Sequence, residues 1–359
     1  MSSEFKPAVV PHAEPARGAQ LYRVAIVGAA SLKGKEVAEV LNDRNFPSVD
    51  VKLLDDDESL GQIEAVGEEV TFIQKVRADQ FRNLDFSFFA SDPECTRNMW
   101  KAARDAGGAI VDLSYALEDE PEAQVRSPWL ERQLGHLPTP ELQPGPAVVA
   151  HPAAVVLALL LQRLSKAGVV TQAAATVFQP ASERGQKGMD ELHEQTVNLL
   201  SFQPMPKNVF DVQVAFNMVS RYGEKAAPTL GEIQDRIMKH YLRIAAEGAV
   251  VPSLMLVQAP IFHGHALAVH VRLGEPADID RVSGAMAGEH VHLTGSAEEA
   301  PSNVNAAGQA DVQLSILPDA AQPNGLWLWA ASDNLRVAAT TAVECAETMA
   351  ASRPRGKIQ

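Results

Sequence analysis

The sequence predicts an α/β protein, in which a Rossmann-like nucleotide-binding domain precedes an α+β domain with a mixed sheet. Three observations carry this prediction. A strand, a glycine turn and a helix follow one another around Gly28, and strands alternate with helices as far as residue 113. Beyond residue 150, several strands alternate in character, as in a mixed sheet with flanking helices. The length of 359 residues suits about two domains with sizeable cores.

The charge, the cysteine content and the apolar runs of the chain limit the partners and compartments that fit it. The formal net charge is −14 without any run of lysine and arginine, which argues against nucleic acid and anionic membrane surfaces as partners. The two cysteines, Cys95 and Cys345, cannot form a disulfide scaffold and fit a reducing compartment, so we expect a cytoplasmic protein. The longest apolar run, 153–161, falls short of the roughly 20 residues that a membrane span needs. Residues 1–20 read as a poorly ordered, non-targeting tail.

The glycine turn is the first candidate for ligand binding. Residues 22–27 form a short β-branched run, and apolar residues at 37–41 recur at helical spacing. A glycine turn between such a strand and helix points backbone N–H groups at an anion. Gly28 and Gly34 give only the spacing G-x-x-x-x-x-G, so the stretch alone leaves open a dinucleotide site or a plain βα corner.

The next elements predict a parallel, doubly wound sheet. Further apolar runs predict strands at 49–54, 84–90 and 109–113 and a helix at about 99–106. Ligands of such sheets bind at the carboxyl ends of the strands. The loops expected to meet at one site are those after Val27, Leu54, Ala90 and Leu113.

A proline-rich passage at 137–146 marks a domain boundary. An apolar helix is predicted after it, as far as residue 164, and apolar positions between 188 and 199 recur at helical spacing. Strands are predicted at 173–179, 254–258, 266–273, 312–317 and 326–331, and a last helix at about 335–351.

Taken together, these residues resemble the aspartate-semialdehyde dehydrogenases. The likeness covers nearly the whole chain from Tyr22, and the order and spacing of its pieces make it specific. The turn at 26–34 is similar to the family's G-A-T-G-x-V-G, and 258–265 is similar to its R-V-P-V-F-x-G-H. The other matching pieces are 110–114, 179–182, 185–192, 195–196, 210–217 and 332–336.

The resemblance implies a nucleotide-binding domain at 21–150, completed by the helix at 335–351. It also implies a central domain at 151–334 that holds the catalytic residues and forms a homodimer. The family reaction is the reversible reductive dephosphorylation of aspartyl phosphate to its semialdehyde, with NADPH as hydride donor. The positions that match the family's cofactor contacts are Gly28, Ser31, Leu32, Gly34, Ser59 and Asn334.

The family's cysteine nucleophile is absent from its usual place. In the family it lies in an Asn-Pro-Asn-Cys or Ser-Pro-Cys stretch that opens the first helix of the central domain; here 150–155 reads AHPAAV. The nucleophile position is Ala153, or Ala154 if the alignment shifts by one, and a methyl group cannot attack an acyl phosphate. Cys95, in the sequence DPEC, superficially resembles the missing motif. We interpret it as a small residue at a helix start, and Cys345 as a core residue.

Two other catalytic positions persist. His265 stands in the place of the family's histidine, which relays a proton to and from the nucleophile; without a thiol, it is either a proton carrier or only a retained polar residue. Gln179 stands where the family's glutamine orients the substrate, and a strand-end polar residue is the alternative interpretation. His263 and His270 lie nearby, but without a partnering cysteine or carboxylate motif we predict no metal site.

The anion-binding positions have changed as well. The family's Ser-Ser-x-x-Arg loop clamps phosphate with its arginine, and here Glu118 stands there, a carboxylate that repels phosphate. Gln258 replaces the arginine of R-V-P-V. Glu58 and Ser59 stand where the family holds the 2′-phosphate of NADP with Arg-Ser, so NAD is favoured over NADP if either binds. Ser31 replaces a glycine of the turn and fits poorly if that position needs a positive φ.

Two classes of function follow. We favour a non-catalytic paralogue, a dimeric scaffold that binds a nucleotide, a small-molecule metabolite or a partner enzyme, because the nucleophile and both phosphate clamps are replaced together. The alternative is a working NAD(P)-dependent oxidoreductase that acts on an aldehyde or oxo group of a different substrate. The related N-acetyl-glutamyl-phosphate reductases also need the cysteine, so they do not resolve the conflict.

Overall fold

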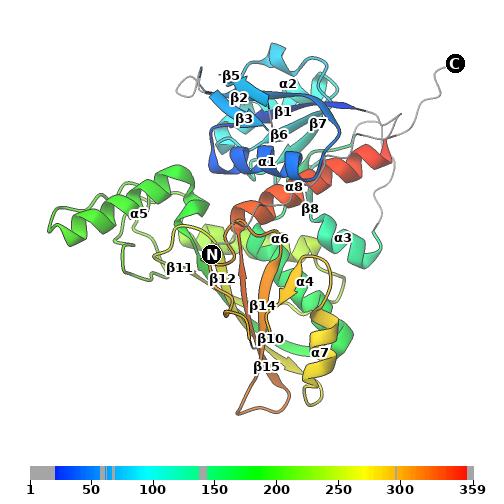
Figure 1. The fold of residues 1–359 in the computed structure, drawn as a ribbon, viewed down its shortest axis with the longest axis vertical. Coiled ribbons are helices and arrows are strands. Elements are labelled where there is room, and N and C mark those ends of the chain that lie inside the picture. Colours follow the sequence, from blue (N-terminus) through cyan, green and yellow to red (C-terminus); the bar gives the residue numbers. More distant parts are fainter. Residues whose placement is uncertain are drawn as a thin grey trace, which may run out of the picture.

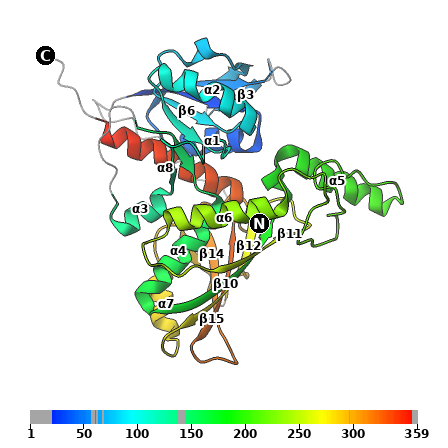
Figure 2. The same cartoon turned by 180° about the vertical axis from the view of Figure 1, so that it is seen from behind.

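The computed structural model describes residues 21–353 except 57–60, 62, 67–68, 137–143 and 296. Figures 1 and 2 show two bodies, each built on one sheet, with helix α8 (Asn334–Ser352) running between them. One sheet is parallel and the other is mixed, which confirms the predicted fold class. Among the described residues, no helix combines the length and apolarity that crossing a membrane requires.

The first sheet has seven strands in the order β5-β2-β1-β6-β7-β9-β8, and all its pairings are parallel. Its strands are β1 (Tyr22–Val27), β2 (Ser48–Asp55), β5 (Gln74–Lys75), β6 (Phe86–Phe89), β7 (Ala109–Asp112), β8 (Gln124–Arg126) and β9 (Ala147–Val149). The helices of this part are α1 (Leu32–Asp43), α2 (Pro93–Asp105) and α3 (Pro128–Leu134), with the short helix η2 (Ala78–Phe81) and the hairpin β3 (Ile63–Val66) and β4 (Glu69–Phe72).

Helices cover both faces of this sheet. Val24 and Ile26 of β1 belong to one core with α1 and α8, whereas Ala25 and Val27 belong to a second core with α2 and η2. Because both faces are buried at the centre of the sheet, the central strands β1, β6 and β7 are largely apolar, which is why the sequence revealed them. The late helix α8 therefore supplies part of the core beneath strands that come much earlier in the chain.

The second sheet is mixed, with six strands in the order β11-β10-β12-β15-β14-β13. The strand β10 pairs in parallel with β11 and antiparallel with β12. These strands are β10 (Val170–Gln179), β11 (Ser253–Gln258), β12 (His265–Leu273), β13 (Val291–Leu293), β14 (Val312–Pro318) and β15 (Gly325–Ser332). The remaining helices are α4 (Pro152–Ala167), η3 (Ala181–Arg184), α5 (Gly185–Leu200), α6 (Leu230–Ile244) and α7 (Ile279–Met286).

The two faces of the second sheet differ. Its inward residues pack in one core with α4, α6 and α7, and these helices lie in front of the strands in Figure 2. The other face carries no covering helix in Figure 1 and exposes residues such as Met255 and Trp327. Helix α5 projects away from the body as an arm in both views.

Some elements differ from the sequence predictions. Helix α2 begins at Pro93 rather than near residue 99, because the Asp92 carboxylate accepts hydrogen bonds from the backbone N–H groups of Glu94 and Cys95. Helices α3, α6 and α7 were not predicted. Helix α6 nevertheless carries a local signal, since Thr229 and Glu232 form a reciprocal capping box at its start.

Candidate active site

A cleft of about 500 Å³ lies between the two sheets. Its walls come from the β1–α1 turn, the loops after β6 and β7, the start of α4, the η3–α5 junction and α6. Ser31, Ser91 and Ser114 all line it, which confirms that the loops after Val27, Ala90 and Leu113 meet at one site. The loop after Leu54 includes Glu58 and Ser59, and both lie outside the described residues.

The glycines of the β1–α1 turn are sterically required. Gly28 has a φ of 83°, and a Cβ there would lie closer than 3.0 Å to the Ser91 backbone. A Cβ at Gly34 would come within the same limit of the Gly28 carbonyl oxygen. These two positions let the turn and the helix pack directly against the sheet.

Ser31 is not strained, so the sequence argument against it does not apply. Its φ is −69°, in the extended region that any residue adopts. Its hydroxyl accepts the Gly34 N–H at 2.9 Å as the N-cap of α1 and donates to the Ala90 carbonyl at 3.0 Å. The serine that replaces the family's glycine thus ties α1 to the end of β6.

An imidazole caps the helix that should carry the nucleophile. His151 Nδ1 accepts the Ala153 N–H at 3.3 Å, and the backbone N–H of His151 donates to His240 Nδ1 at 2.9 Å. A nitrogen that accepts a hydrogen bond carries no proton, so both rings are neutral with the proton on Nε2. Burial lowers the pKa of both histidines, which agrees with the neutral form.

The structure places no thiol in this cleft. Ala153 and Ala154 are fully buried in the apolar core at the start of α4. Cys345 is buried in α8, where desolvation raises its pKa to about 12, and Cys95 lies in the first turn of α2. Burial also raises the pKa of Cys95, which disfavours its thiolate. Neither cysteine is among the described residues that line the cleft.

His265 faces a carboxylate that the sequence analysis did not single out. It is fully buried at the start of β12, and within the described part of the chain neither ring nitrogen has a hydrogen-bond partner. Its Nε2 lies 3.6 Å from Glu183 Oε1, and Nε2 of His151 lies 3.6 Å from Glu183 Oε2. Burial lowers the pKa of His265 despite the nearby carboxylate. Glu183 thus occupies the space between two imidazoles.

Gln179 and Asn334 are tied into the protein. Gln179 Nε2 donates to the Tyr222 hydroxyl at 3.1 Å, and that hydroxyl donates to Gln258 Oε1 at 2.6 Å. Asn334 accepts the Gly264 N–H at 3.1 Å and donates to Glu183 at 2.9 Å. Neither Gln179 nor Asn334 is among the described residues that line the cleft, so their assigned contacts to substrate and cofactor stay predictions.

The structure corrects the argument from Glu118. Its carboxylate does not line the cleft but is paired with Arg236 at 3.2 Å and His240 at 2.9 Å. Burial alone would raise the pKa of Glu118, but these partners outweigh it and lower the pKa. Arg236 itself lines the cleft. The Glu118 carboxylate is therefore paired within the protein, and the charged group that this part of the cleft wall presents is the guanidinium of Arg236.

No metal centre is evident. Among the described residues, no three side chains of histidine, cysteine, aspartate or glutamate are arranged to hold a metal ion. His270 lies further along β12 than His265, and its Nε2 is 2.9 Å from Asp319 Oδ2.

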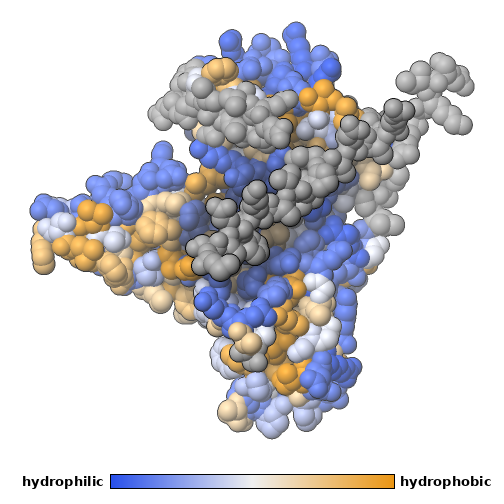
Figure 3. Space-filling model, in the orientation of Figure 1, coloured by the Kyte–Doolittle hydropathy of each residue, from blue (hydrophilic) through white to orange (hydrophobic). Residues whose placement is uncertain are grey.

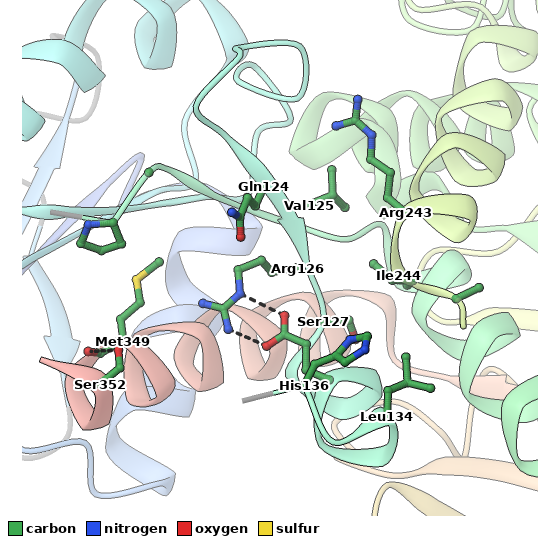
Figure 4. Close-up of a pocket in the computed structure, with 14 residues that line it drawn as sticks. Gln124, Val125, Arg126, Ser127, Leu134, His136, Arg243, Ile244, Met349 and Ser352 are labelled. Atoms are coloured by element: carbon green, nitrogen blue, oxygen red, sulfur yellow. Dashed lines mark hydrogen bonds and ion pairs between the residues drawn. The ribbon is translucent and has the colours of Figure 1, made fainter. Parts of the chain in front are cut away.

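A second pocket, of about 320 Å³, lies between α3, α6 and the end of α8 (Figure 4). Arg126 on its wall is held by Glu131 through bonds of 2.9 and 2.5 Å, so the charge of this guanidinium is already paired. Figure 4 shows Arg243 extending from α6 at its edge. None of the predicted site residues lines this pocket.

Comparisons with known proteins bear on the whole chain. The family model described as semialdehyde dehydrogenase, NAD binding domain, matches residues 23–137, and the one described as semialdehyde dehydrogenase, dimerisation domain, matches residues 161–337. A USG-1 protein homolog of Pseudomonas aeruginosa is 30% identical over 319 residues, covering 88% of this chain and 94% of that protein. An aspartate-semialdehyde dehydrogenase of Rickettsia bellii is 26% identical over 340 residues, covering 91% and 97%.

A solved structure agrees with these matches. That of a probable aspartate-semialdehyde dehydrogenase from Pseudomonas aeruginosa has a TM-score of 0.79 at 30% identity, covering 91% of this chain and 98% of that chain. The fold, both family models and the relatives point the same way. The chain belongs to the aspartate-semialdehyde dehydrogenase family.

Proposed function

We propose that this chain binds a nicotinamide nucleotide in the cleft but does not carry out the thioester chemistry of its family. One observation carries the proposal: neither cysteine lines the cleft, and buried alanines stand at the start of α4. In the family reaction, the acyl group leaves its phosphate before hydride is added to it, and a nucleophile must hold the acyl group between these two steps. His265 faces Glu183 where it would need to face a thiol.

The β1–α1 turn supports nucleotide binding. The amides of Leu32 and Lys33 are the first two of α1 and therefore lack partners within the helix, and both residues line the cleft. A pyrophosphate accepts such N–H groups, with the helix dipole adding to the attraction. When bound, the nicotinamide nucleotide would donate or accept the hydride, and residues of this chain would hold its phosphates.

A hydride-transfer assay tests the missing step. Aspartate semialdehyde and phosphate should give no reduction of NADP or NAD by the wild-type chain. Ala153→Cys and Ala154→Cys should recover little activity, because Gln258 still stands where the family has an anion-binding arginine and its amide is bonded to backbone carbonyls. Turnover by the wild type would refute the proposal, and full recovery in either variant would show that only the sulfur is missing.

The cofactor is proposed to be NAD rather than NADP. Asp55 ends β2, and its carboxylate accepts the Ala30 N–H at 2.7 Å, which places negative charge beside the turn. Glu58 follows in the sequence where the family has an arginine for the 2′-phosphate. A carboxylate accepts a hydrogen bond from a ribose 2′-hydroxyl and repels a phosphate. Calorimetric titration should show tighter binding of NAD, and tighter NADP would contradict this assignment.

We also propose a homodimer formed by the second sheet and the α5 arm. Exposed apolar side chains gather there, and Figure 3 shows apolar residues along the arm. They include Val197, Leu200, Phe202, Phe216, Met218 and Met255. Patches of this kind in soluble proteins mark interaction surfaces, and the matched dimerisation model agrees. Light scattering of Leu200→Glu beside the wild type tests it, since the charge should shift the dimer toward monomer.

A further inference from the structure

Lys33 is an unusual residue in the turn. The family-like pattern G-A-T-G-x-V-G has an apolar residue just before its last glycine, and this chain has a lysine there. The side chain crosses from α1 to the end of β7, where Nζ donates to the Leu113 carbonyl at 3.0 Å. Nζ also lies 4.4 Å from the ring centre of Tyr115. These contacts fix a primary amine on the wall of the cleft.

The surroundings shift the protonation equilibrium of Lys33 toward the free amine. Burial lowers the pKa of Lys33 by more than the carboxylates of Glu183 and Asp112 raise it. Only the neutral form of lysine is nucleophilic, and desolvation is one of the ways in which proteins generate it. Lys33 therefore has the properties of a reactive lysine, in addition to its position on the cleft.

Groups that transfer protons line the same cleft. Glu183 lines the same cleft as Lys33, and its side chain is 5% exposed. His151, on the cleft wall, directs its Nε2 proton toward Glu183 at 3.6 Å. A buried carboxylate beside a neutral imidazole can accept and return a proton within the site.

We propose that Lys33 captures aldehydes in the cleft as an imine, with Glu183 handling the protons. The Nζ lone pair attacks the carbonyl carbon and forms a C–N bond while the C=O π bond breaks, and the oxygen takes one of the two nitrogen protons to become a hydroxyl. The remaining nitrogen proton passes to Glu183 and from there to the hydroxyl, which leaves as water as the nitrogen lone pair forms the C=N bond. The ligand class is small aldehydes, and no oxidant or nucleotide takes part. The inference goes beyond the proposed function and does not rest on it.

Reductive trapping tests the capture step. The nucleotide-free full chain is incubated at pH 7 with glyceraldehyde and cyanoborohydride, which reduces imines, and the label on each lysine is followed by peptide mass spectrometry. Lys33 should be labelled several-fold faster than Lys187, an exposed lysine on the same cleft, because the lowered pKa of Lys33 increases its fraction of free amine. In Lys33→Met, the fast single adduct should vanish from the intact mass. Labelling of Lys33 no faster than Lys187 would overturn the proposal.

A second variant separates proton transfer from simple electrostatics. Glu183→Gln removes a negative charge that stabilises the ammonium form, so a purely electrostatic role predicts faster labelling of Lys33. Proton transfer by Glu183 predicts slower labelling, since loss of water from the adduct needs an acid. Faster labelling would remove Glu183 from the proposed site. Because Gln is close to isosteric and circular dichroism reports folding, loss of the native structure is recognised directly.

Discussion

The two ends of the cleft differ in what they have kept. At the β1–α1 turn, Gly28 and Gly34 still meet a strict steric demand, and Ser31 fills the remaining position without strain. At the start of α4, where the resemblance leads us to expect the reacting group, Ala153 and Ala154 are fully buried and Nε2 of His151 lies 3.6 Å from Glu183. The comparison teaches that the packing of the turn depends on the absence of a Cβ at two positions, whereas the chemistry at the start of α4 depends on which side chains stand there.

The largest expected effect falls at the turn. Gly34→Ala should reduce the free energy of unfolding by about 3 kcal/mol, because its Cβ would collide with the backbone of Gly28 and Ala29. Gly284→Ala is the matched control, since nothing lies within 4 Å of a Cβ there, and alanine in helix α7 should stabilise by up to about 1 kcal/mol. Urea unfolding measures both. Equal stability of the two variants would mean that the turn is not sterically closed.

A smaller effect is expected at the start of α8, where Asn334 donates to Glu183. Asn334→Ala should cost about 2 kcal/mol, because the buried Gly264 N–H and the Ser182 hydroxyl would lose their acceptor. Asn198→Ala, which removes an exposed bond to the Pro204 carbonyl, should cost less than about 1 kcal/mol in the same urea experiment. A neutral Asn334→Ala variant would favour the cofactor role that the family resemblance assigns to this residue.

The smallest effect per residue is a loss of stability in acid. Burial lowers the pKa of His151, His240 and His265, so the native state binds fewer protons than the unfolded state below about pH 6.5. Their contribution is complete above that pH and is lost as the pH falls. The loss per histidine is at most about 1.4 kcal/mol at one pH unit below the unfolded value.

Urea midpoints between pH 8 and 5 measure this loss. His265→Gln should flatten the acid limb, while His193→Gln, on an exposed face of α5, should leave the profile as in the wild type. An unchanged limb in His265→Gln would mean that His265 is already charged in the native state, and the site would then hold a charged imidazole beside Glu183.

The fold was more predictable than the site. Strands such as β1 and β7 are buried on both faces, so their apolar runs stand out in the sequence. Helix α6 was missed although its apolar positions recur at helical spacing, because charged residues dominate its exposed side. The sequence suggests that Glu118 repels phosphate, because its partners Arg236 and His240 lie more than a hundred positions later and give no local signal. Glu183 gave no pattern at all, because its role depends on two histidines brought together only by the tertiary structure.

The position of α8 has a consequence for how this chain is made. Its apolar side, including Ala339, Val343 and Ala346, closes the face of a sheet whose strands leave the ribosome long before it does. Until α8 is made, the part of that face that α1 does not cover stays exposed, so the domain built on this sheet cannot complete its folding earlier. Assembly of this domain is therefore coupled to a helix that follows β1 by most of the length of the chain.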